Sequence, residues 1–321
     1  MSQIYLLHEN DAWMPPFHAA LRAEGLPFAD WHLAEGRLDL AAAPPEGVFY
    51  NRMSASSHTR GHRYAPEYAS CVLAWLEGHG RRVANGTRAL ALEVNKVAQY
   101  AALERFGIRV PRTQAAVGGE AAIEAAGGFA GRPFITKHNR AGKGLGVKLF
   151  RNLESFLAHL DGPEFEPSVD GVLLIQEYIE APEPFITRVE FVGGKLFYAV
   201  RVDTSQGFEL CPADACRVDE AFCPADGKQP AMFEIVESFR HPLVERWEAF
   251  LAANRIEVAG IEFILDRDGV AYTYDVNTNT NYNPEAEAKA GRSAPRAVAK
   301  FLGRELAALE GATNLPRRAV G

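Results

Sequence analysis

The residues best suited to chemistry in this 321-residue chain form a glycine-rich stretch at positions 137–147, Lys-His-Asn-Arg-Ala-Gly-Lys-Gly-Leu-Gly-Val. Its alternate glycines, Gly142, Gly144 and Gly146, leave backbone N–H groups uncovered and let the chain approach an anion closely. Lys137 follows an apolar run and adds a point charge that can hold a phosphate. The stretch therefore predicts a phosphate-binding loop.

The flanking residues distinguish this loop from other phosphate-binding loops. A P-loop needs Ser or Thr directly after its lysine and then a helix, whereas Gly144 follows Lys143 here. A dinucleotide fingerprint also opens a helix, but residues 147–150 alternate like a strand. We expect a strand–loop–strand hairpin that covers phosphates. The plainer alternative is a flexible hairpin tip with Arg140 and Lys143 in solvent.

An acidic hairpin over residues 260–277 is the second candidate site. Asp268 and Gly269 are a strong turn signal between two alternating runs, and we expect Leu265 to pair with Val270. Alternation then assigns one face of the returning strand to Val270, Tyr272, Tyr274 and Val276, and the other to Thr273, Asp275 and Asn277.

The polar face of this hairpin is suited to a divalent cation. In the expected register Glu262 pairs with Thr273 and lies diagonal to Asp275, about 7–8 Å away at the backbone, so both carboxylates can reach one ion. With Asn277 they offer hard oxygens, which suit Mg²⁺, with Mn²⁺ as the alternative ion. A half-exposed hairpin that is acidic by chance is the plainer reading, but the polar run at 278–283 is typical of a site loop.

The elements that must position these residues begin with alternating strands and helices, which favour a parallel, doubly wound sheet. Strands are expected at residues 4–7, 28–33, 47–51 and 83–86, and helices at 13–24 and 67–79. A helix at 94–106 leads to a second unit with strands at 133–138, 147–150 and 172–178 and a helix at 152–160. The expected domains are residues 1–88, 89–178 and 179–321.

Composition excludes several other classes of protein. The chain is 47% hydrophobic and 23% charged, as in ordinary globular proteins, and its net charge of −7 argues against broad nucleic-acid binding and adhesion to anionic membranes. No apolar run can span a bilayer and no signal peptide is evident. No zinc spacing is completed, so free thiols in a reducing cytoplasm are expected for Cys71, Cys211, Cys216 and Cys223. A homodimer is the default assembly.

Together these segments resemble the ATP-grasp superfamily, most closely its RimK-like (ribosomal-protein-glutamate-ligase-like) branch. The resemblance runs from Asn95 to Asn283 and implies an α/β (α+β) fold, with the N-terminal doubly wound domain followed by a central lobe with the flap and a C-terminal lobe with the metal site. It implies ATP and Mg²⁺ as cofactors. It also implies a carboxylate–amine ligase that makes an acylphosphate from a small-molecule or peptide acid, joins it to an amine, and releases ADP and phosphate.

The resemblance also implies roles for individual residues. The phosphate-binding residues would be Lys96, Lys137, Gly142, Lys143, Gly144 and Gly146. The adenine would meet the hinge formed by Gln176, Glu177, Tyr178 and Ile179, the metal ligands would be Glu262, Asp275 and Asn277, and the catalytic cations would be Arg188 and Arg201. Ile186 occupies the family's usual acidic position near the ribose, so Glu180 or Glu183 is expected to substitute. Glu190 resembles an acidic position of other ATP-grasp branches.

Other readings stay open from the residues alone. Substrate contacts are expected from residues 51–57 and 204–216, where Arg52 either clamps a carboxylate or caps a strand end. His58 and His62 lie four apart but lack a third ligand for a metal ion. Two other functions share the ATP-binding residues: a small-molecule kinase, and a noncatalytic nucleotide-binding regulator.

Overall fold

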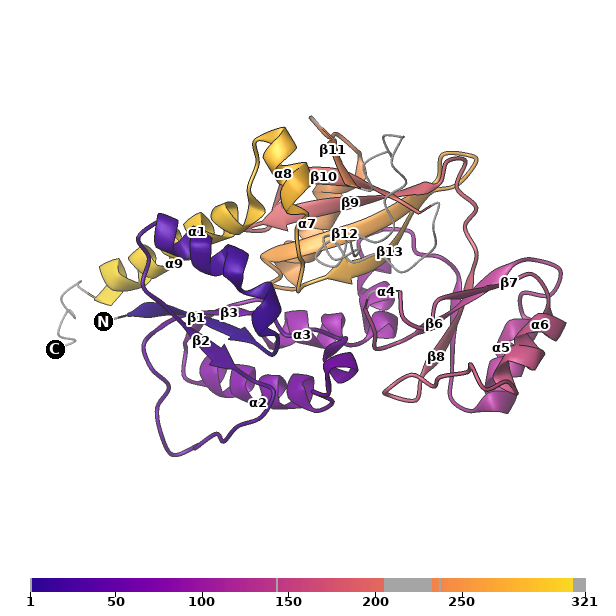
Figure 1. Ribbon diagram of the computed structural model, residues 1–321, viewed down its shortest axis with the longest axis horizontal. Coiled ribbons are helices and arrows are strands. Elements are labelled where there is room, and N and C mark those ends of the chain that lie inside the picture. The colour runs from indigo at the N-terminus through magenta and orange to yellow at the C-terminus, as the bar shows by residue number, and fades with distance from the viewer. Residues whose placement is uncertain (1, 143, 205–232, 237, 314–321) are drawn as a thin grey trace, which may run out of the picture.

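The computed structural model describes residues 2–142, 144–204, 233–236 and 238–313, and places three sheets along an elongated molecule (Figure 1). Of the cysteines, Cys71 is exposed and free, whereas Cys211, Cys216 and Cys223 lie outside the described residues, as does Lys143. Within the described ranges, no helix is long and apolar enough to cross a membrane.

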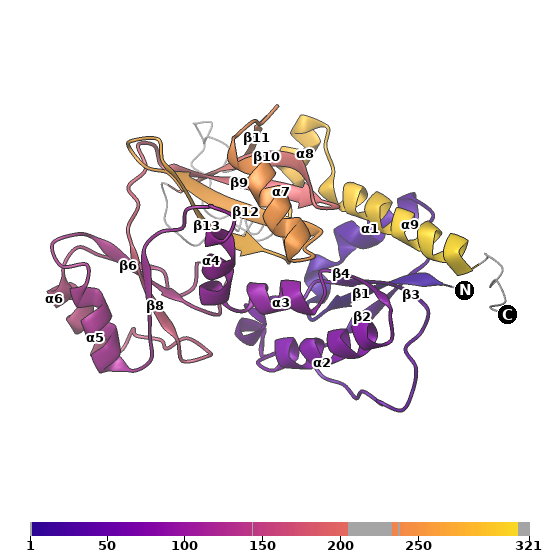
Figure 2. The ribbon, with the colours of Figure 1, turned by 180° about the vertical axis from the view of Figure 1, so that it is seen from behind.

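The first sheet is entirely parallel, as the alternating pattern predicts. Its strands are β1 (Gln3–His8), β2 (Phe28–His32), β3 (Gly47–Asn51) and β4 (Arg82–Ala84), in the order β2-β1-β3-β4. Helices α1 (Pro15–Ala23) and α9 (Ala294–Thr313) cover one face, and α2 (Ala65–Gly78) covers the other (Figures 1 and 2). The predicted doubly wound N-terminal unit is therefore confirmed, although α9 comes from the far end of the chain.

The second sheet carries the glycine-rich hairpin. It is antiparallel in the order β5-β8-β6-β7 and contains β5 (Thr113–Ala116), β6 (Phe134–His138), β7 (Lys148–Phe150) and β8 (Leu173–Glu177). Helices α5 (Gly119–Gly127) and α6 (Leu153–Leu160) pack on one face through an aromatic cluster that includes Phe134, Phe150 and Phe156. We call this unit the flap sheet.

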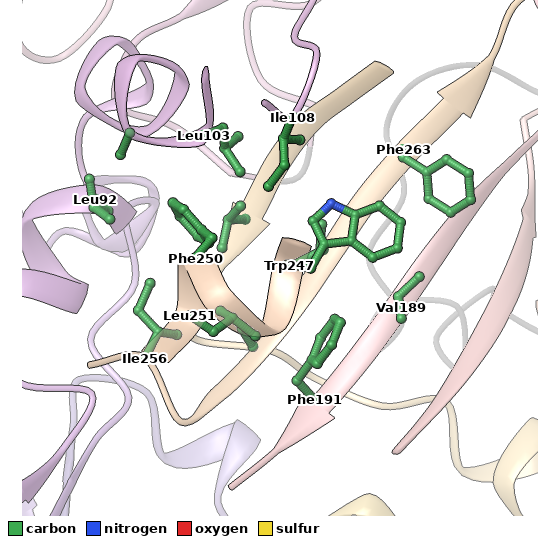
Figure 3. Packing of buried hydrophobic residues seen from close by; sticks show 14 of the residues in the cluster. Leu92, Leu103, Ile108, Val189, Phe191, Trp247, Phe250, Leu251, Ile256 and Phe263 are labelled. Atoms are coloured by element: carbon green, nitrogen blue, oxygen red, sulfur yellow. The ribbon is translucent and has the colours of Figure 1, made fainter. Parts of the chain in front are cut away.

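The third sheet is the C-terminal sheet, with antiparallel order β11-β10-β9-β12-β13. Its strands are β9 (Phe185–Val192), β10 (Lys195–Asp203), β11 (Phe233–Val236), β12 (Val258–Leu265) and β13 (Ala271–Asn277). Helices α3 (Thr87–Glu93), α4 (Lys96–Glu104) and α7 (Leu243–Ala253) supply side chains to the core of this sheet, and α8 (Pro284–Ala290) follows β13. Figure 3 shows Trp247 and Phe250 of α7 among Phe191, Phe263 and Leu103. Helices α3 and α4 thus share a core with residues beyond position 179, across the expected domain boundary.

The acidic hairpin forms at β12 and β13, but its expected register is wrong. Glu262 pairs directly with Asp275, and Leu265 pairs with Ala271. A bulge between the Glu262 and Phe263 pairs leaves Tyr274 as an extra residue on β13. Because the bulge shifts the alternation, the expected faces of Thr273 and Tyr274 are exchanged: Thr273 is fully buried, and Tyr274 lines a cavity.

Candidate active site

A cavity of about 570 Å³ lies between the flap sheet and the C-terminal sheet. Its walls include residues of the glycine hairpin, the segment after β8, and strands β9, β12 and β13. The predicted site residues on these walls are Lys96, Lys137, Gly142, Gly144, Gln176, Glu177, Tyr178, Ile179, Glu183, Arg188, Glu262, Asp275 and Asn277. Residues separated by as many as 181 positions in sequence therefore meet in one space large enough for a nucleotide-sized ligand.

Lys96 reaches the cavity from the first turn of α4. Asn95 caps this helix, because its side chain accepts a hydrogen bond from the Ala98 N–H at 3.0 Å. Asn139, just after β6, binds the same helix start, because its side chain accepts from the Val97 N–H at 3.1 Å. The Lys96 ammonium donates to Asp275 Oδ1 at 2.6 Å. The lysine is thus buried and positioned from both sides of the cavity.

Lys137 ends at the same wall, beside the bulge of β13. Its ammonium donates to the carbonyl of Tyr274 at 3.1 Å and lies 5.1 Å from the Tyr274 ring centroid. Tyr100 hydroxyl lies 3.4 Å from the same ammonium and accepts a hydrogen bond from Gln176 Nε2 at 3.1 Å. None of these partners of Lys137 is a carboxylate, so its positive charge is available to an anion.

The flap hairpin folds over the cavity and contacts the first unit. Gly144 and Gly146 have φ of +78° and +73°, a region that favours glycine. Gly142 and Gly144 line the cavity, whereas Gly146 packs against the His138 ring and its carbonyl accepts a hydrogen bond from Thr136 at 2.9 Å. We infer a structural role in the hairpin for Gly146, and a direct contact with phosphate only for the other two.

Arg140 attaches the flap to α2. Its guanidinium donates to both carboxylate oxygens of Glu67, at 2.6 and 3.2 Å, and to the Arg63 carbonyl at 3.1 Å. Burial by itself would raise the pKa of Glu67, but hydrogen bonds from Arg140 and Arg63 lower it to about 2. The alternative reading of Arg140 as a solvated tip residue is wrong, because its side chain is 7% exposed.

The acidic wall holds oxygen donors on adjacent strands. Glu262 and Asp275 face each other across the β12–β13 ladder, and Asn277 Nδ2 lies 3.4 Å from Glu262 Oε1. Burial raises the pKa of Glu262 against the opposing charge of Arg188. Burial also acts to raise the pKa of Asp275, but the charges of Lys96 and Lys137 together with the hydrogen bond from Lys96 outweigh it, so this pKa is lowered. Both polar side-chain atoms of nearby Asn279, which also lines the cavity, are buried without a hydrogen-bond partner among the described residues. This donor set fits a hard cation such as Mg²⁺.

Arg188 is fixed by a buried network beside the acidic wall. Its guanidinium donates to Glu190 at 2.6 Å, to Glu262 at 3.2 Å, and to the Thr280 hydroxyl. A Cβ on Gly260 would lie 2.6 Å from Arg188 Nε, so only glycine leaves room for this guanidinium. Paired carboxylates raise the pKa of Arg188 although burial opposes them, so the side chain stays charged.

Solved structures resemble the chain over nearly its whole length. D-cycloserine synthetase DcsG superimposes with a TM-score of 0.66 at 16% identity, over 94% of this chain and 99% of that one. A RimK domain ATP-grasp protein from Sphaerobacter thermophilus DSM 20745 gives 0.62 at 19% identity, over 94% and 99%. The ATP-grasp ligase PsnB complexed with a minimal precursor gives 0.66 at 16% identity, over 95% and 99%. The chain has the ATP-grasp fold. No family model and no curated protein matches it.

The segment after β8, which is the expected hinge, lines the cavity. Glu177 is held by the Arg112 N–H, which donates to its carboxylate at 2.6 Å. Glu180 and Glu183 both line the cavity beside Ile186. Glu180 pairs with Arg267 at 2.7 Å, whereas the Glu183 carboxylate makes no hydrogen bond or ion pair to any described residue. Of the two expected substitutes, Glu183 is therefore the one whose carboxylate is unpaired among the described residues.

Arg201 is not brought to the cavity. Across the β9–β10 ladder it pairs with Thr187, one position away from the Val200–Arg188 pair. Because side chains alternate along a strand, Arg201 lies on the opposite face from Arg188, exposed and 4.8 Å from the Phe185 ring centroid. The geometry gives no support to its expected catalytic role.

Arg52 directly follows β3 and is not among the residues that line the cavity. It is 2% exposed, lies 3.9 Å over the Phe17 ring, and donates to the Thr280 carbonyl at 3.2 Å and to Asn281 Oδ1 at 2.8 Å. It therefore joins the first unit to the polar run after β13.

Sequence reasoning missed several cavity residues. Trp13, Glu93 and Tyr274 line the wall although no motif marks them. Glu93 anchors the polar run, because it accepts hydrogen bonds from the N–H and the hydroxyl of Thr278 at 2.6 and 3.1 Å. In contrast, Ser54 and Ser56 of the expected substrate loop do reach the cavity, while the other expected loop, 204–216, lies outside the described residues after Thr204.

Proposed function

We propose that this protein is an ATP-dependent carboxylate–amine ligase that forms an amide bond through an acylphosphate and releases ADP and phosphate. The observation that carries the proposal is a single cavity, in an ATP-grasp fold, where two lysines and a glycine flap face an acidic wall and a buried arginine. Phosphoryl transfer depends chiefly on positioning and on neutralising charge, which is what such a constellation provides.

The proposed binding mode assigns each wall a part of ATP. Hinge residues 176–179 would meet the adenine and Glu183 the ribose. Lys96, Lys137 and the N–H groups near Gly142 and Gly144 would bind the phosphates. Glu262, Asp275 and Asn277 would hold Mg²⁺, which supplies charge neutralisation to the phosphates when bound. Asn279, whose amide has no partner among the described residues, would bind either the hydrated ion or the acyl substrate.

Activation makes the carboxylate reactive toward an amine. A carboxylate oxygen attacks the γ-phosphorus, the bond to the β–γ bridging oxygen breaks, and ADP leaves with that electron pair. The amine then attacks the acyl carbon, phosphate is expelled, and the amine loses a proton. Arg188, charged and rigidly held, would stabilise the negative charge that develops on the acyl oxygen. The closed flap would exclude water, which otherwise hydrolyses the acylphosphate.

The substrate side of the cavity would be the wall formed by Trp13, Ser54 and Ser56. The names of the structural neighbours include both peptides and a small molecule: PsnB and the macrocyclase MdnC of Microcystis aeruginosa MRC are complexed with precursor peptides, and DcsG is a D-cycloserine synthetase. PsnB was also solved with Mg and ADP. Both peptide and small-molecule acids and amines are therefore candidate substrates.

The test measures ADP and phosphate release from ATP and Mg²⁺ across panels of amino acids, dipeptides and longer peptides. Lys137→Ala and Asp275→Ala should abolish release that depends on both an acid and an amine. Lys195→Ala is the matched control, because this lysine is 76% exposed and pairs with Glu248 away from the cavity. ADP release that requires a hydroxyl compound and no amine would contradict the ligase activity and favour a kinase activity. ATP binding without any stimulated release would favour a regulator.

A further inference from the structure

A second cluster of chemically capable side chains lies at the edge of the first sheet. His8 is the last residue of β1, His32 is the last residue of β2, and the two pair in the parallel ladder. Asp11 follows three residues after His8 and begins the short 3-10 helix η1 (Asp11–Trp13). Ligands of open α/β sheets bind at the carboxyl ends of the strands, which is where these three residues meet.

The distances within the cluster are close to those of a metal site. His8 Nδ1 lies 3.8 Å from Asp11 Oδ1, and His32 Nε2 lies 4.0 Å from the same oxygen. One ligand atom of each residue can be chosen so that all three lie within 4.8 Å of one another. Tetrahedral bonds of 2.0–2.1 Å separate neighbouring ligand atoms by about 3.3 Å. An ion would therefore draw each imidazole nitrogen roughly half an ångström closer to the Asp11 oxygen, and two atoms at the 4.8 Å limit by about 1.5 Å.

An unpaired buried histidine marks this cluster as more than a chance grouping. His8 is only 2% exposed, and neither of its ring nitrogens has a hydrogen-bond partner within the described part of the chain. The carboxylates of Asp11 and Asp30 lie 3.8 and 3.7 Å away, beyond hydrogen-bond distance. A buried polar group without a hydrogen-bond partner is destabilising, so the site favours a partner that is not one of the described protein atoms.

The residues around the cluster are arranged like those that commonly orient the ligands of a metal site. His8 Nε2 faces Asp30, and Asp30 in turn is hydrogen-bonded to His18 at 2.9 Å. The nitrogen of a metal-bound histidine that does not bind the ion commonly faces a carboxylate, which orients the ring. On the exposed side, His32 meets His62 edge to face at 5.8 Å between ring centroids.

We propose that His8, Asp11 and His32 form a binding site for a divalent transition-metal ion of the Zn²⁺ class. Two imidazoles and one carboxylate suit this class, whereas the oxygen-rich wall of the ATP cavity suits Mg²⁺. Since the Asp11 and His32 side chains are 86% and 40% exposed, the fourth coordination position faces solvent and can accept water or a ligand group. The proposal stands independently of the proposed ligase activity.

Occupation of this site would fix the position of η1. Trp13, at the end of η1, lines the ATP cavity and carries the Arg60 guanidinium 4.6 Å from its ring centroid. Arg60 is also ion-paired with Glu9, the neighbour of His8, at 2.5 Å. A metal ion bound at Asp11 would therefore stiffen the substrate side of the cavity.

The experiment titrates Co²⁺ into the full chain after chelator treatment, in excess Mg²⁺ and reducing agent, and follows visible d–d absorption and stoichiometry by calorimetry. Asp11→Asn and His32→Ala are the test variants, because both side chains are partly exposed and their loss leaves the core intact. His79→Ala, an exposed histidine at the end of α2, is the matched control.

Support requires that both test variants lose one equivalent of Co²⁺ relative to the wild type, or bind it about 100-fold more weakly, while His79→Ala binds normally. The same stoichiometry and spectrum in all four proteins would overturn the proposal, as would loss in only one test variant. X-ray absorption spectroscopy of the protein with one equivalent of Zn²⁺ is a second, independent test. Nitrogen and oxygen neighbours support the site, whereas a sulfur shell at about 2.3 Å would assign the ion to cysteines instead.

Discussion

The two walls of the cavity are held in place by different means. On the C-terminal sheet, the charged groups are paired with one another: Arg188 with Glu190 and Glu262, and Asp275 with Lys96 of the adjacent α4. Arg188, Glu190 and Lys96 are buried, and Glu262 and Asp275 are mostly buried. On the flap side, closure depends on Arg140 meeting Glu67 of α2, a residue that is half exposed. The wall on the C-terminal sheet is thus preorganised, whereas the flap is held where Arg140 contacts α2.

We infer from this difference that ligand binding must supply free energy to close the flap but not to arrange the acidic wall. Removing one member of a buried ion pair leaves an uncompensated charge and is strongly destabilising, so the acidic wall keeps its geometry before any ligand arrives. The Arg140–Glu67 pair is half exposed on the Glu67 side, where water screens the charges, so we expect the flap to open at a smaller cost than rearrangement of the acidic wall would require. The predictions below test this contrast from the largest expected effect to the smallest.

Asp275→Asn should have the largest effect, because it removes a proposed metal ligand and leaves Lys96 without its carboxylate. We expect ADP release to fall by about 100-fold or more. Steady-state release at saturating ATP measures the loss, and Asp268→Asn, in the exposed turn, is the matched control. An Asp275→Asn enzyme with near wild-type release would refute the assignment of the acidic wall.

Gly260→Ala should disturb the preorganised wall without removing any charge. The new methyl group would displace the Arg188 guanidinium, and we expect about a tenfold lower kcat together with roughly 1–3 kcal/mol of lost stability. Gly78→Ala, where an added Cβ meets no atom within 4 Å, is the control. Kinetics and denaturant unfolding measure the two effects. Unchanged kcat in a destabilised variant would show that Arg188 does not act on the reaction.

Gly146→Ala should disturb the flap hairpin on the other side of the cavity. The residue has positive φ, and a Cβ would collide with the His138 ring, so we expect the KM for ATP to rise more than kcat falls. Gly131→Ala also introduces a side chain at positive φ, +79°, but in open space, and so reports backbone strain alone. Equal effects of the two substitutions on KM would contradict a specific role for the flap.

Glu67→Gln should have the smallest effect, a rise of a few-fold in the KM for ATP and faster proteolysis of the flap. Since the folded-state pKa of Glu67 is lowered to about 2, its stabilising effect is fully present above pH 4.5 and is lost as pH falls toward 2. The difference in proteolysis rate between wild type and variant should therefore be constant above pH 4.5 and shrink below it. A difference in proteolysis rate that grows as the pH falls would contradict the proposed role of the Arg140–Glu67 ion pair in closing the flap.

Local patterns made the strands, the glycine hairpin and the order of the site residues predictable. The hairpin register was not predictable, because a non-local contact sets it. Thr273 turns into the core, where its hydroxyl accepts from the Trp247 indole at 3.1 Å and its N–H donates to the Arg109 carbonyl at 2.8 Å. The bulge at Tyr274 follows from that contact, and no residue within the hairpin signals it.

The same limit applies to Arg201 and to the histidine cluster. The face of Arg201 depends on how β10 pairs with β9, which the spacing of two arginines does not reveal. His8 and His32 are 24 positions apart and meet only because β1 and β2 are parallel neighbours. The more local pair, His58 and His62, offers a sequence signal, yet His62 instead lies 2.8 Å from the Glu9 carboxylate.

The return of α9 to the first sheet has a consequence for how the chain is made. Val298, Phe301 and Leu302 of α9 share a core with Ile4 and Leu6 of β1, nearly three hundred residues earlier. During synthesis, the part of the first sheet's face that α9 covers stays exposed beside α1 until residues 294–313 leave the ribosome. Contacts of such long range form slowly and expose apolar surface meanwhile. The N-terminal third is therefore expected to depend on chaperones until translation is nearly finished, and to aggregate when synthesised without α9.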